Sequence, residues 1–141
     1  MYYGLGCRSV SKIYLPKDYD LDILFKQFYS WKGVINNSSY YNNYIYNKTI
    51  YLMSEEKFFD NGFLILKESR EIGSPIGAIF FEYYENDNTV IKSLKKYSEK
   101  IQCIIGKNIV ENSIEFGNAQ RPSLDDFADK INTLDFLLKL S

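Results

Sequence analysis

The sequence predicts an α/β fold in a single domain, residues 1–141, with a largely parallel sheet flanked by helices. Three observations support this fold class. Short strand-like runs alternate with segments of helical periodicity, and the clearest run is AIFFEYY at residues 78–84. Hydrophobic residues make up 45% of the chain and aromatic residues 17%, enough to form a folded core. The length of 141 residues suits one domain, and no internal repeat is present.

The first predicted elements are a strand followed by a helix. Residues 9–15 alternate polar and apolar side chains and end before Pro16, which is typical of a strand. Residues 20–29, DLDILFKQFY, space their leucines and phenylalanines as on one face of a helix. Asp20 is the expected N-cap of this helix, and Gly33 is its expected stop.

The next segment, residues 36–53, is unusually rich in asparagine and tyrosine. We predict a second helix here, because a Ser/Asn cap signal precedes side chains that recur at helical spacing. The recurring side chains are Tyr41, Ile45, Lys48 and Leu52. The Asp-Asn-Gly sequence at 60–62 then predicts a turn, and residues 63–66 predict a short strand.

A glycine- and proline-containing loop at 71–77 leads into the strand predicted at 78–84. Residues 86–88, Asn-Asp-Asn, offer a cap for a helix over 89–97. The run IQCIIG at 101–106 is continuously apolar, which is typical of a strand buried on both faces.

Another short strand is predicted at residues 113–117. Residues 121–141 then predict one or two helices that close the chain, with Ser123 and Asp126 spaced like a capping box.

The charge balance excludes some partners. The formal net charge is −1 and the pI is about 5.5, so no basic field attracts nucleic acid or an anionic membrane surface. We find neither an apolar stretch long enough to span a bilayer nor a signal peptide, and we therefore expect a cytoplasmic protein. Cys7 and Cys103 lie too far apart in sequence to suggest a disulfide framework or a zinc pattern.

The chain contains no histidine. Catalytic Ser-His-Asp and Cys-His arrangements are therefore excluded, as is any metal site with histidine ligands. The paired carboxylates at 55–56 and 125–126 are better explained by helix faces and caps than by a metal site, and we predict none.

Cys7 is the candidate nucleophile. It lies between Gly6 and Arg8, directly before the first predicted strand. Positive charge from Arg8 and Lys12 would favour the thiolate, and the amides of a glycine-rich loop can stabilise an oxyanion. The alternative is a structural cysteine at the start of a strand. Cys103, between apolar neighbours, is expected to be an inert core residue.

Two further positions have weaker signals. Glu71 belongs to the loop that precedes a strand, and carboxylates in such loops often contact ligands. Gly106 and Lys107 follow an apolar run as in a phosphate-binding turn, but the other glycines of that motif are missing.

Five blocks, taken in order, resemble the C-terminal part of bacterial acyl-CoA reductases. These enzymes are related to the fatty acyl-CoA reductase of bioluminescence and belong to the aldehyde dehydrogenase superfamily. The resemblance extends over essentially the whole chain, and the order of the blocks makes it specific. The blocks are GLGCRSVSKIYLPKDYDL, YYNNYIYNKTIYL, SPIGAIFFEYY, KIQCIIG and FGNAQRPSLDDFADKINTLDFLLKL.

The resemblance assigns roles to particular residues. Cys7 takes the place of the nucleophile in the superfamily's Gly-Gln-x-Cys sequence, although Leu5 replaces the glutamine. Gly6 and Arg8 would then support the oxyanion loop. Glu71 and Pro75 match the ends of Glu-x-Phe-Gly-Pro, whose glutamate contacts the nicotinamide ribose. The implied fold is that of the catalytic domain of aldehyde dehydrogenases.

The implied reaction begins with attack of Cys7 on a fatty acyl-CoA. Hydride from NADPH or NADH would then release an aldehyde. The superfamily's nicotinamide-binding domain precedes the nucleophile and is not part of this sequence, so we expect an incomplete enzyme. The isolated chain should then lack turnover, and it should self-associate or require the missing domain.

Two other functions stay open. The chain could be a non-catalytic binding or assembly domain that retains the fold, or a plain aldehyde dehydrogenase that acts on free aldehydes.

Overall fold

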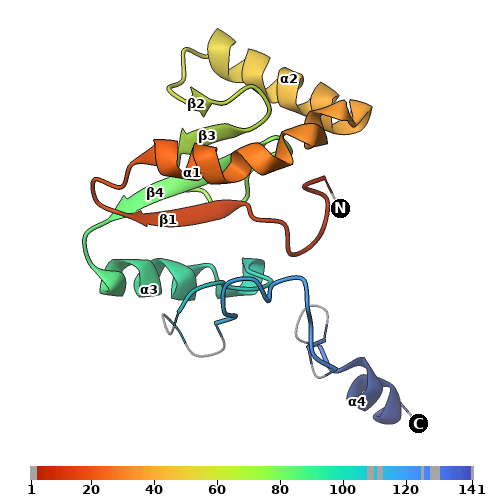
Figure 1. The fold of residues 1–141 in the computed structure, drawn as a ribbon. Helices are drawn as coiled ribbons and strands as arrows, with labels where there is room; N and C mark the ends of the chain where they lie inside the picture. The colour runs from red at the N-terminus through yellow and green to blue at the C-terminus, as the bar shows by residue number, and fades with distance from the viewer. Residues whose placement is uncertain (1–2, 108–109, 111–112, 125, 128–130, 141) are drawn as a thin grey trace. The chain divides into compact units, whose positions relative to one another are not determined.

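The computed structural model describes residues 3–107, 110, 113–124, 126–127 and 131–140. The chain divides into two compact units, Met1–Val90 and Ile91–Ser141. The first unit contains a mixed, mostly parallel sheet with its helices, so the predicted α/β class is confirmed for it (Figure 1). The assignment of residues 1–141 to one domain without a nicotinamide-binding part stays a prediction.

The sheet has four strands in the order β1-β4-β3-β2. Strands β1 (Lys12–Pro16) and β3 (Ile65–Glu68) flank β4 (Ala78–Tyr84), and both run parallel to it. Strand β2 (Phe59–Asp60) is antiparallel to β3, to which the predicted Asp-Asn-Gly turn joins it. The sheet is therefore largely parallel, as predicted, with one short antiparallel edge.

The register places alternate residues of the central strands on opposite faces. Phe80 lies beside Lys12 on β1 and beside Lys67 on β3, so these three share one face. The next residue, Phe81, points to the other face, where it is 1% exposed in the core with Leu66.

Helix α1 (Leu21–Phe28) covers the sheet and packs Leu24, Phe25 and Phe28 against the core (Figure 1). Asp20 caps it as predicted, because its side chain accepts a hydrogen bond from the Asp22 N–H. The predicted stop at Gly33 is wrong. The α-helix ends at Phe28, and the chain continues as the 3₁₀ helix η1 (Tyr29–Asn36). Gly33 lies inside η1 and does not adopt the left-handed conformation of a helix C-cap.

The tyrosine-rich segment forms helix α2 (Ser38–Met53), with Asn37 as the cap, so the predicted helix is confirmed. The side chains whose spacing predicted the helix are not the ones that it buries. Tyr41, Ile45 and Leu52 are 44%, 39% and 59% exposed, whereas the buried face consists of Tyr40, Tyr44, Asn47 and Tyr51.

Polar partners explain the choice of face on α2. The hydroxyl of Tyr40 donates to the Phe63 carbonyl at 2.9 Å, and that of Tyr44 donates to Asp60 Oδ1 at 2.7 Å. A tyrosine can be buried when its hydroxyl is satisfied, and its ring then contributes a large apolar area to the core.

Helix α3 (Asp87–Lys96) begins in the first unit and continues into the second. Asn86 accepts a hydrogen bond from the Asn88 N–H, which confirms the predicted cap. The 3₁₀ turn η2 (Ser98–Lys100) follows α3. The strand predicted next, at residues 101–106, does not form. The described residues there form a single bridge, Ile105 to Ile114, and no sheet covers the apolar run on both sides.

Near the end of the chain, the described part of residues 121–127 is not helical. The Asp126 N–H donates to the Ser123 carbonyl, and the helix that Ser123 and Asp126 were expected to start is not found among these described residues. Helix α4 (Thr133–Leu138) begins later and is capped by Asn132. It confirms one of the one or two helices predicted for residues 121–141. Asp125 and residues 128–130 lie outside the description. Throughout the described chain, no helix is both long and apolar enough to cross a membrane.

Candidate active site

The predicted nucleophile lies on a tight turn at the entrance to β1. The Ser9 N–H donates to the Gly6 carbonyl at 2.9 Å and closes a turn in which Cys7 is the second residue. The Cys7 thiol is free and exposed, and Arg8 beside it is half-buried. The turn therefore leaves Cys7 exposed to solvent.

A second loop supports the loop that carries Cys7. Gly4 has a φ of +85°, which favours glycine, and a Cβ built on it would lie 3.7 Å from Ile76 Cγ2. The segment before the thiol thus packs against the loop between β3 and β4. This is the loop that contains Glu71.

Helix α2 fixes the far end of the β3–β4 loop. Asn47 Nδ2 donates to the Ile76 carbonyl at 3.0 Å. Gly77, with a φ of +83°, passes so close to α2 that a Cβ on it would lie 2.8 Å from Tyr44 Cα. Only glycine satisfies both the backbone angle and the close approach.

Ser69 organises the near end of the same loop. Its N–H donates to the Phe81 carbonyl at 3.0 Å, and its hydroxyl oxygen accepts from the Glu71 N–H at 3.1 Å. Its carbonyl accepts a hydrogen bond from Lys12 Nζ. The backbone at Glu71 is therefore held, while the Glu71 side chain is exposed.

Lys12 does not supply the charge that was expected near Cys7. Its side chain is 5% exposed, and Nζ lies 2.8 Å from Glu82 Oε2 and 5.2 Å from the centre of the Tyr14 ring. Lys12 and Glu82 lie on the same face of neighbouring parallel strands, which explains the pairing. The ammonium thus joins β1, β4 and the Ser69 carbonyl.

Glu71 and Cys7 are not joined by any contact that the described residues show. The pKa of Tyr51 on α2 is raised mainly by burial, and the charges of Glu56 and Glu71 raise it further. Glu71 therefore lies near α2. The two loops meet at Gly4 and Ile76 instead. The assignments of Cys7 as nucleophile and Glu71 as cofactor contact stay predictions.

The second cysteine lies in the other compact unit. Cys103 is a reduced cysteine that is half-buried rather than fully enclosed. The strand that was expected to bury it does not form, which explains why it is less buried than expected of a core residue.

Sequence reasoning missed a charged cluster around Asp60. Its carboxylate accepts from the Tyr44 hydroxyl and from the Gly62 N–H at 2.9 Å, and it pairs with Lys48 Nζ at 2.5 Å. Burial by itself would raise the pKa of Asp60, but Lys48, Tyr44 and Gly62 together lower it. The Asp-Asn-Gly turn was the only sequence signal here, and it did not reveal the partners from α2.

Chemically, the described site offers one exposed thiol on a glycine-rich turn and one exposed loop carboxylate. Among the described residues, no group of three cysteine, aspartate or glutamate side chains could hold a metal ion. No protein-family model matches the chain, and no curated protein or solved structure is significantly similar to it.

Proposed function

We propose that this chain is the catalytic-thiol part of a cytoplasmic acyl-CoA reductase and that Cys7 accepts the acyl group. The observation that carries the proposal is the exposed Cys7 thiol on the turn closed by Ser9 and Gly6. The order of sequence blocks that resembles these reductases supports it.

The first half-reaction needs only a thiolate and donors for the oxyanion. Cys7 Sγ attacks the thioester carbonyl, the carbon–sulfur bond to CoA breaks, and CoA leaves as its thiolate. Backbone amides of the Gly6–Arg8 turn would stabilise the oxyanion of the tetrahedral intermediate. The products are an acyl-cysteine and one free CoA thiol.

The second half-reaction uses NADPH or NADH, which supplies hydride when bound. This chain would contribute the Glu71 carboxylate, whose exposure leaves its oxygens able to accept hydrogen bonds from ribose hydroxyls. Its backbone is held by Ser69, so the carboxylate is presented from a defined position. The rest of the cofactor site would belong to a nicotinamide-binding domain, the partner that the proposal requires.

The test is acylation of the isolated chain by octanoyl-CoA without reductant. Intact mass should show one octanoyl adduct, with one CoA thiol released for each adduct. Cys103→Ser should acylate at the same rate and Cys7→Ala should not acylate. Adducts on Cys103 alone, or an unmodified chain at both pH 7 and pH 9, would contradict the proposal.

A second candidate is a non-catalytic binding or assembly domain, and the exposure of apolar side chains on α4 favours it. Leu134, Phe136, Leu137 and Leu138 of this helix are each more than half exposed. Under this candidate the chain self-associates in sedimentation experiments and Cys7→Ala changes nothing. Under the first, Cys7→Ala removes acyl transfer whatever the state of association.

A further inference from the structure

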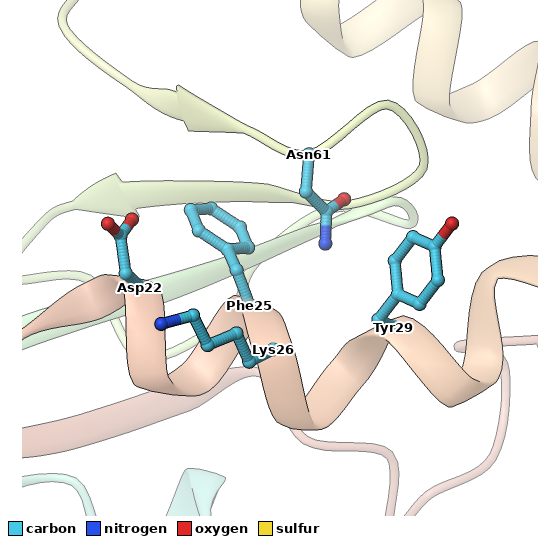
Figure 2. Close-up of a pocket in the computed structure, with 5 residues that line it drawn as sticks. All are labelled: Asp22, Phe25, Lys26, Tyr29 and Asn61. Carbon is cyan, nitrogen blue, oxygen red and sulfur yellow. The ribbon is translucent and has the colours of Figure 1, made fainter.

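A hollow of about 350 Å³ lies between α1 and the Asp60–Gly62 turn, in the first compact unit, and its lining residues do not include Cys7. Five residues line it: Asp22, Phe25, Lys26, Tyr29 and Asn61. Figure 2 shows the Asn61 side chain pointing from the turn toward α1, with its nitrogen directed between the rings of Phe25 and Tyr29.

The orientation of the Asn61 amide is fixed by its oxygen. Oδ1 accepts hydrogen bonds from the Leu64 N–H at 2.9 Å and from the Phe63 N–H at 3.2 Å. Rotating the amide by 180° would bring its NH₂ group against two N–H donors and would lose both bonds. The NH₂ group therefore points toward α1, between Phe25 and Tyr29, and is covered there in the structure.

Asn61 Nδ2 is buried and has no hydrogen-bond partner among the described protein atoms. A buried donor without a partner costs about 1–3 kcal/mol, and native structures rarely tolerate it without a reason. An acceptor that enters the hollow would recover this free energy. Asn61 is thus a positioned donor without an acceptor among the described residues.

Two aromatic side chains, Phe25 and Tyr29, form part of the wall of the hollow. Phe25 packs against the core, whereas Tyr29 is exposed and contacts Lys32, whose Nζ lies 4.6 Å from the centre of the Tyr29 ring and 3.1 Å from its hydroxyl. Asp22 and Lys26, one helical turn apart on α1, contribute opposite charges and leave the lining without net charge.

We propose that this hollow binds an uncharged planar ring that bears a carbonyl oxygen. The ring lies against Phe25 and Tyr29, and the carbonyl oxygen accepts a hydrogen bond from Asn61 Nδ2. Binding involves a small adjustment of the exposed Tyr29 side chain, because the donor is covered in the structure. The site is independent of acyl transfer by Cys7.

The test uses the full chain labelled with ¹⁵N and titrated with acetophenone, which has a ring and a carbonyl oxygen but no donor. The side-chain NH₂ signals of Asn61 should move downfield, together with the backbone signals of Phe25 and Tyr29. Toluene, which lacks the oxygen, should bind at least about tenfold more weakly, since one hydrogen bond to a desolvated donor is worth about 1.4 kcal/mol.

The matched variant is Asn61→Asp. It keeps an oxygen for the Phe63 and Leu64 N–H groups and so keeps the turn, but it removes the donor. Acetophenone should bind this variant at least about tenfold more weakly. Equal binding by the variant, equal binding of toluene, or a bound water whose NOE to the Asn61 NH₂ persists at saturating acetophenone would each overturn the proposal.

Discussion

Gly77→Ala tests whether the contact between α2 and the β3–β4 loop is as tight as the structure shows. The new Cβ would lie 2.8 Å from Tyr44 Cα and 2.9 Å from Tyr44 Cβ, distances that real Cβ atoms do not tolerate. Tyr44 is 2% exposed and cannot move aside without moving the helix. Overpacking of this kind costs about 1–3 kcal/mol.

The backbone adds a second penalty to Gly77→Ala. At a φ of +83°, a residue with a Cβ is strained by about 1–2 kcal/mol. Together the two terms predict a loss of about 2–5 kcal/mol in the free energy of unfolding. Urea denaturation followed by circular dichroism measures this loss directly.

Two other glycines separate the two penalties. Gly62→Ala has the backbone term alone, because its φ is +92° and no atom lies within 4 Å of the added Cβ, so about 1–2 kcal/mol should be lost. Gly73→Ala has neither term and should be neutral or stabilising by up to about 1 kcal/mol. If Gly77→Ala costs no more than Gly62→Ala, the close approach of α2 to this loop is wrong.

Three further predictions concern the buried charges and the helix α2. Because the folded pKa of Asp60 lies below its ordinary value of 3.8, its stabilisation is complete above that value and is lost as the pH falls through the folded pKa. Asp60→Asn should therefore lower the urea midpoint more at pH 7 than at pH 3, and an equal loss at both pH values would contradict this. Lys12→Met leaves the partly buried Glu82 without its partner and should cost about 2–3 kcal/mol in urea denaturation. Lys17→Met breaks an exposed pair and should cost under about 0.5 kcal/mol. Equal costs would refute the argument that burial makes the first pair more important. In thermal unfolding, Tyr51→Ala should cost about 3–5 kcal/mol and Leu52→Ala under about 0.5 kcal/mol. The reverse order would mean that α2 buries the face with Leu52 and not the face with Tyr51.

Local signals predicted the first unit well. Asp20 and Asn86 act as caps, and the Asp-Asn-Gly turn and the strand at 78–84 lie where their residues indicated. Each of these depends on side chains and backbone within a few residues, which a sequence displays directly. The α/β class followed from the alternation of such elements.

Predictions that depended on distant partners failed. On α2, the spacing of Ile45 and Leu52 predicted the helix, but the Phe63 carbonyl and the Asp60 carboxylate determine that the tyrosine face is the buried one. The apolar run at 101–106 could become a buried strand only beside other strands, and the described residues offer it one bridge at Ile114. Burial is decided by what the rest of the chain brings to a segment.

The same distant contacts set the surroundings of Cys7. The sequence singled out the thiol because glycines precede it, but it did not show why Gly4 is glycine. In the structure, Tyr44 leaves room only for glycine at position 77, Asn47 holds the Ile76 carbonyl, and Ile76 in turn packs against Gly4. The buried face of α2 is therefore the one that supports the loop carrying Cys7. It follows that Gly77→Ala should alter the alkylation rate of Cys7, because this series of contacts connects α2 to the loop that carries this thiol.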